Sequence, residues 1–248
     1  TVLREGQLIA TVGTEALTPD SIAQMMVGRE LSNLYPPKHE PDVDADVVLS
    51  VRNLVAPGVK DFSFDLRRGE ILGFAGLIGS GLVPRLAGEI SVNGIAQDFT
   101  DVAQSVGAGL AYMTKDRKGR GLLLNVGLLP NLTLLTLSKH IRHGFLDGRS
   151  EERALERATR RFDIRARDAS VNVGQLSGGN QQKLMLGKTM ESEPDIIIMD
   201  EPTRGIDVGT KQQIYHIIAA LAAEGKSIIL ISSEMQEVIG LSHRVLVM

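Results

Sequence analysis

A serine followed by two glycines at the start of an expected helix constrains this chain more than any other feature. The segment LSGGNQQK occupies positions 176–183. Glycines at a helix start leave backbone N–H groups accessible, and the helix dipole adds partial positive charge there. A phosphate or another anion is the ligand that such a helix end favours. The candidate binding residues are Ser177, Gly178, Gly179 and Asn180.

The apolar segment IIIMD at positions 196–200 is followed by a second acid, so two carboxylates, Asp200 and Glu201, are neighbours. Its length and β-branched residues predict a buried strand. Ligands of α/β sheets bind at the carboxyl ends of the strands, so both acids are expected beside a ligand. Asp200 is the candidate magnesium ligand, and Glu201 is the candidate that faces water.

Each motif alone also fits a plain structural role, as a capped turn before a helix or a buried strand that ends in acids. Their combination, with the continuation DEPTRGIDVG at positions 200–209, resembles the ATP-binding cassette (ABC) ATPases of transporters. The motifs are most similar to the second nucleotide-binding domain of bacterial monosaccharide importers of the ribose, galactose and xylose type. This resemblance covers nearly the whole chain.

The resemblance implies an α/β fold of the P-loop NTPase class, with a mostly parallel sheet, an antiparallel edge β-layer and a helical subdomain. It also implies ATP and Mg²⁺ as cofactors. Asp200 would hold the metal, and the catalytic Glu201 would polarise the attacking water. Asp207 falls in the so-called D-loop and is a further candidate contact to nucleotide.

The composition disfavours several other classes of function. The net charge is −3 and no basic block is present, so the chain has no electrostatic signature of a nucleic-acid partner. A soluble cassette ATPase of translation or DNA repair is therefore disfavoured. The absence of cysteine excludes disulfides and thiol chemistry. The longest apolar runs, such as residues 228–231, have the length of a strand and not of a membrane span.

Residues 1–45 are interpreted as the C-terminal tail of a preceding cassette plus a Pro-rich linker. Positions 2–10 predict a hairpin, a helix is expected from about residue 18, and three prolines lie in residues 35–42. Residues 46–248 are interpreted as an ABC nucleotide-binding domain truncated at its C-terminal end. The strand edge at residues 245–248 is expected to attract the hairpin, in the same molecule or a neighbour. A mobile first segment is the alternative.

Alternating residues predict antiparallel strands at 47–54 and 61–66, and a strand at 70–75 that leads into a phosphate loop. Residues 122–176 are the expected helical subdomain, with Ser150 capping an amphipathic helix. A strand at 195–199, a helix at 210–223 and a strand at 227–232 complete the expected parallel sheet.

The segment GLIGSG at positions 76–81 resembles the first part of a phosphate-binding loop, G-x-x-x-x-G-K-[S/T]. Its candidate residues are Gly76, Leu77, Ile78, Gly79, Ser80 and Gly81. Leu82 stands at the lysine position, and Pro84 would break the following helix. About ten residues, roughly three helical turns, are absent compared with the family. Either they are deleted, or a disordered segment was left out of the sequence, which the matches on both sides favour.

Two other positions depart from the family. Lys115 stands where cassettes carry a magnesium-contacting glutamine, and a cation cannot ligate a metal, although it can contact phosphate. Ser233 stands at the catalytic switch position of a histidine that senses the γ-phosphate. A serine can form hydrogen bonds but cannot carry the charge of an imidazolium. The chain's own pocket is therefore expected to be slow or silent.

The resemblance implies that Ser177, Gly178 and Gly179 complete the nucleotide pocket of a partner nucleotide-binding domain. The function predicted is ATP-driven import of a monosaccharide, with membrane permease subunits as partners and a periplasmic sugar-binding protein as an indirect one. The expected location is peripheral, at the cytoplasmic face of the inner membrane. The alternative is a nucleotide-binding regulatory or dimerisation domain without turnover.

Overall fold

The computed structural model describes residues 1–4, 7–11, 25, 34–40, 42, 44–75 and 86–247. Strands β1 (Val2–Arg4) and β2 (Gln7–Ala10) form the predicted antiparallel hairpin. Among the described residues they pair only with each other, so within this chain the hairpin does not extend the edge of β13 (Arg244–Val247). The helix expected from residue 18 lies almost wholly outside the described residues.

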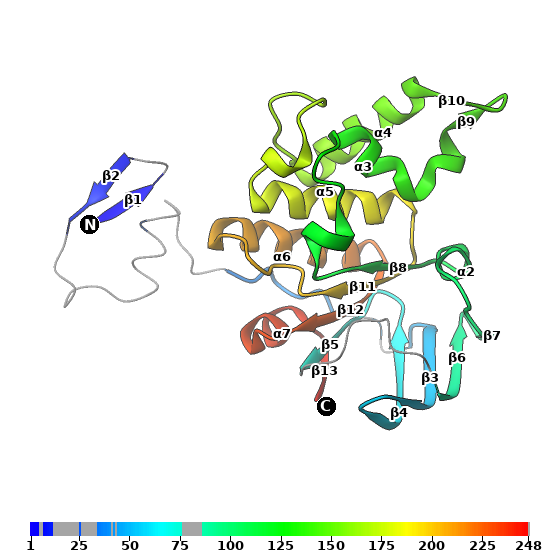
Figure 1. Cartoon of the computed structure of the whole chain (residues 1–248). Helices are drawn as coiled ribbons and strands as arrows, with labels where there is room; N and C mark the ends of the chain where they lie inside the picture. The colour runs from blue at the N-terminus through cyan, green and yellow to red at the C-terminus, as the bar shows by residue number, and fades with distance from the viewer. Residues whose placement is uncertain are drawn as a thin grey trace.

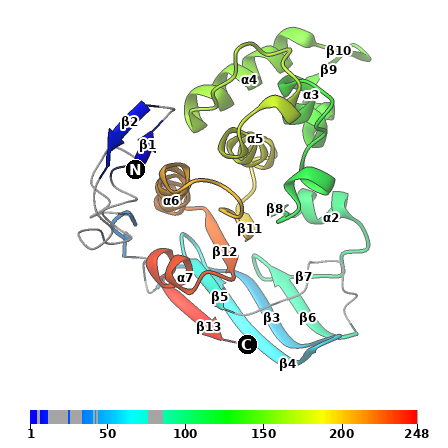
Figure 2. The same cartoon turned by 60° about the vertical axis from the view of Figure 1, so that its left-hand side comes forward.

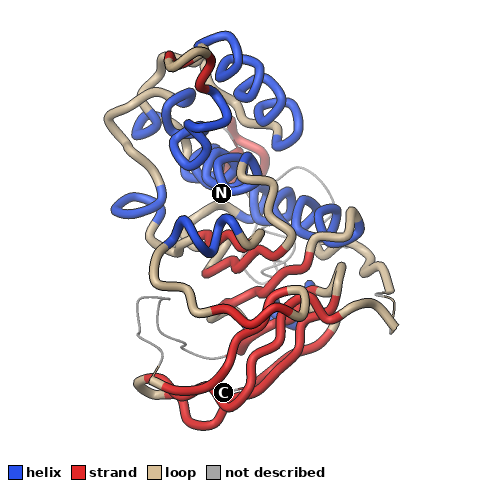
Figure 3. Tube along the Cα trace, turned by 90° about the vertical axis from the view of Figure 1, so that its right-hand side faces the viewer, coloured by secondary structure: helices blue, strands red, loops and turns tan. Residues whose placement is uncertain are grey.

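Four strands form an antiparallel layer in the order β4-β3-β6-β7. They are β3 (Val47–Ala56), β4 (Val59–Arg67), β6 (Ala87–Val92) and β7 (Ile95–Gln97). The β3–β4 turn contains Gly58 at φ 85°, a left-handed conformation that glycine adopts without strain. The predicted edge layer is confirmed, and Figure 3 shows its strands stacked beneath the rest of the molecule.

The second sheet is entirely parallel, in the order β13-β5-β12-β11-β8. Its other members are β5 (Ile71–Ala75), β8 (Leu110–Met113), β11 (Ile196–Asp200) and β12 (Ser227–Ser232). The two inner strands β11 and β12 are apolar almost throughout because both faces of the sheet are covered. The strands predicted at 70–75, 195–199 and 227–232 are confirmed to within one residue.

Helices α6 (Val208–Ala223) and α7 (Met235–Leu241) lie beside this sheet, and the short α2 (Val102–Gly107) precedes β8 (Figures 1 and 2). Helix α7 packs so closely on β5 that a Cβ at Gly73 would lie 2.3 Å from Ser242 Oγ. Glycine is therefore required at that strand position. Among the described residues, none of the helices is both long and apolar enough to span a bilayer.

A helical lobe covers the opposite side of the parallel sheet from the antiparallel layer (Figure 1). It comprises α3 (Leu128–Thr133), the 3₁₀ segment η3 (Leu134–His140), the small hairpin β9 (Ile141–Arg142) and β10 (Phe145–Leu146), α4 (Gly148–Phe162), the 3₁₀ turn η4 (Val173–Gln175) and α5 (Gly178–Glu191). The range 122–176 is thus helical apart from that hairpin, and its limits as a subdomain stay a prediction.

The N-cap of α4 is Asp147 and not Ser150, so that prediction was wrong by three residues. The Asp147 carboxylate accepts hydrogen bonds from the N–H groups of Arg149 and Ser150, at 3.1 and 3.3 Å. Ser150 lies in the first turn, where its Oγ pairs with His140 Nδ1 at 2.9 Å. Aspartate caps as well as serine, and the earlier aspartate moves the helix start forward.

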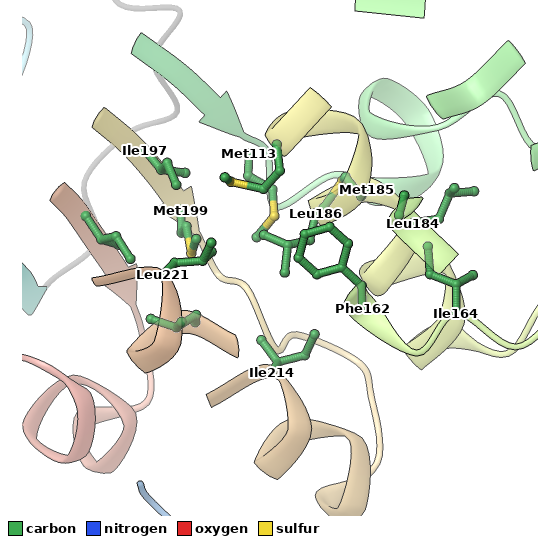
Figure 4. Close-up of a cluster of buried hydrophobic side chains, with 14 of the residues drawn as sticks. Met113, Phe162, Ile164, Leu184, Met185, Leu186, Ile197, Met199, Ile214 and Leu221 are labelled. Atoms are coloured by element: carbon green, nitrogen blue, oxygen red, sulfur yellow. The ribbon is translucent and has the colours of Figure 1, made fainter. Parts of the chain in front are cut away.

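Two apolar cores hold these layers together. The larger core joins the parallel sheet to the helical lobe and α6, as Figure 4 shows for Met113 and Met199 of the sheet, Leu186 of α5 and Phe162 of α4. The smaller core, which includes Leu49, lies between the two sheets. The phosphate-loop and signature regions therefore belong to one packed body.

Residues 34–40, here named the strap, pack against α6 and α7 although the sequence predicts a linker there. The Tyr35 ring stacks on Tyr215 of α6, with ring centroids 5.0 Å apart. Lys38 Nζ donates to the carbonyls of Ile239 and Ser242, both at 2.7 Å, and so caps the C-terminal end of α7. The boundary at residue 45 stays a prediction, but the strap is part of the packed body.

Glycine at position 240 makes room for the strap. A Cβ built there would lie 2.4 Å from Cδ1 of the Tyr35 ring. We expect Gly240→Ala to lower the free energy of unfolding by about 1–2 kcal/mol, because the ring must move out of its stacked position. Chemical denaturation measures this.

The matched control for that experiment is Gly148→Ala, since Gly148 also lies in a helix but has no atom within 4 Å of an added Cβ. Alanine there is expected to leave stability unchanged or to raise it by about 0.5 kcal/mol. Equal effects at the two glycines would contradict the close packing of Tyr35.

Candidate functional site

The predicted site residues gather because four parallel strands end at one edge of the sheet. Asp200 pairs with Ile231 in the β11–β12 register, and Met199 pairs with Met113 in the β11–β8 register. Glu201 therefore lies between Ser233, which follows β12, and Lys115, which follows β8. Strand β5 ends at the same edge, but the candidate loop residues 76–81 lie outside the described residues.

Asp200 is 3% exposed, and its Oδ2 accepts a hydrogen bond of 2.8 Å from the Tyr112 hydroxyl. Within the described ranges, no three acidic or histidine side chains gather as a metal cluster. Magnesium in nucleotide sites usually binds one or two carboxylates, with water and phosphate oxygens as its other ligands. A single buried carboxylate at the strand end therefore fits Mg²⁺ bound together with a nucleotide.

Glu201 has a left-handed backbone, with φ at 51°, which non-glycine residues rarely adopt. Its N–H donates to the Ile231 carbonyl at 2.8 Å, and its Oε1 accepts from the Ser233 N–H at 2.8 Å. Strained backbone of this kind is frequent at functional sites. The two hydrogen bonds hold the acid at the sheet edge and join it to the turn after β12.

Ser233 and Lys115 both have exposed side chains. The structure thus brings the predicted switch position next to Glu201 through a backbone contact. The ammonium group of Lys115 stands on the loop that leaves β8, beside the ends of β11 and β12. The arrangement offers one exposed cation, one exposed hydroxyl and two carboxylates along this described edge.

A buried carboxylate, Glu237 of α7, supports the edge from below. It is 1% exposed, and its Oε1 accepts a 2.8 Å hydrogen bond from the Thr203 hydroxyl. Its Oε2 accepts from the Ser232 hydroxyl. Burial raises the pKa of Glu237, although these two hydroxyl donors and Lys211 lower it in part. Glu237 thereby joins the turn after Glu201 to the end of β12.

Ser177 is the N-cap of α5, as its place before two glycines predicts. Its Oγ accepts from the Asn180 N–H at 3.3 Å and from Asn180 Nδ2 at 3.1 Å. Asn180 Oδ1 in turn accepts from the Arg165 N–H at 2.8 Å. Because the first N–H groups of a helix have no partner within the helix, the backbone of Gly178 and Gly179 can donate to an anion.

The start of α5 packs on the segment that follows Glu201. A Cβ on Gly178 would lie 3.2 Å from the Gly205 carbonyl oxygen, and one on Gly179 would lie 2.5 Å from Thr210 Cγ2. Glycine at position 179 is therefore required by packing as well as by access to ligand. The signature segment and the paired acids border the same region of the molecule.

Asp207 is the N-cap of α6 beside this contact. Its two carboxylate oxygens accept from the N–H and the hydroxyl of Thr210, at 2.9 and 2.7 Å. Burial raises the pKa of Asp207, but the hydrogen bonds from Thr210 outweigh it and hold the pKa below its usual value. The residue is an ionised cap in this structure, and its contact with nucleotide stays a prediction.

Arg117 lies at the centre of these segments and was not among the predicted site residues. It opens a single π-helical turn, η2 (Arg117–Gly121), in the loop after β8. Its Nε and Nη1 donate to the side-chain oxygens of Gln181 and Gln182, each at 3.1 Å. Burial lowers the pKa of the Arg117 guanidinium.

Sequence reasoning also missed Tyr112, Thr203 and Glu237. Tyr112 follows from the β8–β11 register, because it precedes the strand end by the same number of positions as Ile198. Strand alternation places such a side chain on the same face as Asp200. The Thr203–Glu237 contact joins positions 34 apart, and no local pattern indicates it.

A groove of about 420 Å³ opens between α2, β8 and α5, at the border between the sheet and the helical lobe. Its wall is largely apolar and includes Val102, Val106 and Met185, and two cations, Arg120 and Lys188, also line it. Lys188 is 8% exposed and its Nζ donates to the Gly121 carbonyl at 2.9 Å. Burial lowers the pKa of Lys188.

Curated proteins match over the full length of the chain. A ribose import ATP-binding protein of Burkholderia pseudomallei is 42% identical, and the match covers 100% of this chain and 50% of that protein. One of Burkholderia ambifaria is 41% identical with the same coverage. The chain spans about half the length of the curated relatives it matches, and it corresponds to their second half.

The alignment with the Burkholderia ambifaria protein is 259 positions long against 248 residues, a difference of 11 positions that lack a counterpart here. This number agrees in size with the segment of about ten residues expected between Gly81 and Leu82, where a loop helix of roughly three turns is missing.

Solved structures support the same fold at low sequence identity. A nucleotide-free ATP-binding cassette from an ABC transporter superposes with a TM-score of 0.70 at 17% identity, covering 82% of this chain and 88% of that one. A dimeric ATP-binding cassette in a post-hydrolysis state with ADP and Pi gives 0.68 at 19% identity, covering 81% and 94%. The family of ABC transporter domains matches residues 59–204. Since more than half of the chain lies in that match, the protein belongs to the ABC transporter family of ATP-binding cassettes.

Proposed function

We propose that this chain is the second ATP-binding cassette of a bacterial monosaccharide importer, and that its main chemical contribution is made to its partner cassette. The observation that carries the proposal is the contact between the start of α5 and the turn after Glu201. It puts the N–H groups of Gly178 and Gly179 at the border of the edge that holds the paired acids. The names of the relatives, which are import ATP-binding proteins, support the transport role.

In its own pocket, Glu201 would orient and polarise the attacking water, and Asp200 would hold Mg²⁺ through the oxygen that Tyr112 does not bond. When bound, Mg²⁺ neutralises charge on the phosphate oxygens. Lys115 would contact phosphate in place of the family's glutamine. Ser233 would donate a hydrogen bond where the family uses a histidine, so the transition state receives less positive charge and turnover is slow.

In the partner's pocket, the segment 177–180 would close over the triphosphate. Ser177 holds the helix start in shape through Asn180, and the two glycines supply donors without side chains that would keep the phosphate away. Preorganised donors of this kind do not reorganise when charge develops on the phosphate. The contribution therefore does not depend on whether the chain's own pocket turns over.

The groove between α2, β8 and α5 is the surface we assign to the membrane permease subunits. An amphipathic segment with an acidic residue would match its apolar wall and the cations Arg120 and Lys188. The chain would then lie peripherally at the cytoplasmic face of the inner membrane, and a periplasmic sugar-binding protein would act on it only through the permease.

The second candidate is a nucleotide-binding regulatory or dimerisation domain without turnover, which the side chains of Lys115 and Ser233 favour. ATP hydrolysis by this chain alone, compared with hydrolysis after mixing with the preceding cassette, separates the candidates. We expect the chain alone to hydrolyse at least about 100-fold more slowly than the mixture, because donors from one cassette complete the other's pocket. Hydrolysis by the chain alone at the rate of the mixture would contradict a weak pocket, and no gain on mixing would favour the regulatory role.

A further inference from the structure

We propose that Arg117 is a positioning residue, which holds the start of α5 against the turn after Glu201 and so fixes the signature segment that the partner cassette uses. The inference rests on the proposed contribution of residues 177–180 to the partner's pocket. It adds a residue that none of the recognised motifs contains.

The first part of the argument is how Arg117 reaches the signature segment. Its Nε donates to Gln181 Oε1, which is 3.1 Å away. Gln181 is 4% exposed, and its Nε2 donates to the carbonyls of Val173 and Leu176, both at 3.1 Å. Leu176 immediately precedes Ser177. One buried amide thus connects the guanidinium to the backbone on the N-terminal side of the signature segment.

The second part is the contact with the turn after Glu201. Arg117 Nη1 also points to the Arg204 carbonyl, at the long distance of 3.5 Å. A Cβ on Gly178 would lie 3.3 Å from Arg117 Nη2 and 3.2 Å from the Gly205 carbonyl. The Arg204 N–H in turn donates to the Glu201 carbonyl at 3.2 Å. The guanidinium therefore lies between the helix start and the turn that begins at the catalytic acid.

The third part is the loop that carries Arg117. Asp116 closes this loop, because its Oδ1 accepts from the Gly119 N–H at 2.9 Å and its carbonyl accepts from the Arg120 N–H at 3.0 Å. Lys115 immediately precedes the closed turn. A shift of Lys115 toward a phosphate would consequently move Arg117, and with it the start of α5.

The acceptors around Arg117 explain why arginine is needed. They are amide and carbonyl oxygens of three residues, Gln181, Gln182 and Arg204. A planar guanidinium has donors in fixed directions and can reach all three at once, whereas a lysine ammonium is a single point on a flexible chain. The role is thus a hydrogen-bonded bracket and not an ion pair with a carboxylate.

The test compares Arg117→Lys with Lys118→Ala in the complete two-cassette protein. Lys118 lies in the same turn and is exposed, so it is the matched control. We expect Arg117→Lys to lower kcat for ATP hydrolysis about tenfold with KM for ATP little changed, because a small misplacement of donors slows the chemical step. The melting temperature should stay within about 2 °C, which is small for a domain of this size. Lys118→Ala should change neither constant.

An unchanged kcat in Arg117→Lys would overturn the inference, and so would an equal fall in Lys118→Ala. A fall in kcat that only follows a large loss of melting temperature would also count against a positioning role. The variant Gly178→Asp separates this failure from that of the proposed function. If Gly178→Asp stops hydrolysis and Arg117→Lys does not, only the role of Arg117 is wrong. If neither variant affects hydrolysis, the contribution to the partner's pocket is wrong as well.

Discussion

Replacing Gly178 by aspartate is expected to lower ATP hydrolysis by the paired cassettes about 100-fold or more. The new carboxylate would occupy the helix start where the phosphate is expected, and it would repel the triphosphate. Loss of a single preorganised donor to a developing anion already costs about 10²–10³ in rate. Steady-state hydrolysis by the two-cassette protein measures the effect.

The fold should tolerate this change, because an acid in the first turn of a helix interacts favourably with the helix dipole. Gly148→Asp is the matched control, since Gly148 is also the first residue of a helix and an added Cβ meets no atom within 4 Å there. Circular dichroism of both variants checks the fold. Normal hydrolysis by a folded Gly178→Asp protein would remove the basis for the proposed role of the signature segment.

Replacing Glu237 by alanine is expected to lower the free energy of unfolding by about 3 kcal/mol. The change leaves the hydroxyls of Thr203 and Ser232 buried without their shared acceptor, and each such group costs about 1–3 kcal/mol. Glu237→Gln keeps the shape and one acceptor, so its loss should stay within about 1 kcal/mol. Denaturant unfolding of both variants gives the comparison, and equal losses would argue against the hydrogen-bonded network.

The same carboxylate predicts a dependence of stability on pH. Burial raises the pKa of Glu237 in the folded protein above the ordinary value of 4.5, and the charge of Glu234 raises it further, whereas the Ser232 and Thr203 hydroxyls and Lys211 lower it in part. The phenol groups of Tyr35 and Tyr215 face the same carboxylate. As the pH rises above 4.5, the unfolded chain loses this proton before the folded protein does, so stability falls until the pH passes the folded pKa.

Glu237→Gln removes that component, so the variant should gain stability relative to the wild type as the pH rises. The exposed Glu152 provides the control, because Glu152→Gln should give the same pH profile as the wild type. Unfolding free energies at several pH values above 4.5 test this. A constant difference between wild type and Glu237→Gln would contradict a raised pKa.

The sheet edge could be predicted from the sequence because it depends on local patterns. Asp200 and Glu201 end an apolar strand, and Ser233 follows another, so parallel pairing alone brings them together. The small error at α4 has a similar local origin, since Asp147 and Ser150 are both good caps and only the packed structure selects one. Patterns of this kind predict the class of fold and the location of the acids.

The contacts that support the edge could not be predicted, because they join segments that are distant in sequence. Arg117 meets Gln181 across 64 positions, and Thr203 meets Glu237 across 34. Neither pair has a spacing that one helix or one strand would bring together. The strap shows the same limit, since its prolines indicate a linker and only the stacking of Tyr35 on Tyr215 reveals that it is packed.

The left-handed backbone at Glu201 has a consequence for how this protein evolves. A non-glycine residue in that conformation lowers stability by about 1 kcal/mol or more, whereas glycine would adopt it freely. Folding alone thus favours replacement of the acid, and a lineage released from its chemistry would drift toward glycine at this position. The glutamate that this sequence still carries is therefore a sign of selection for reactivity and against ease of folding.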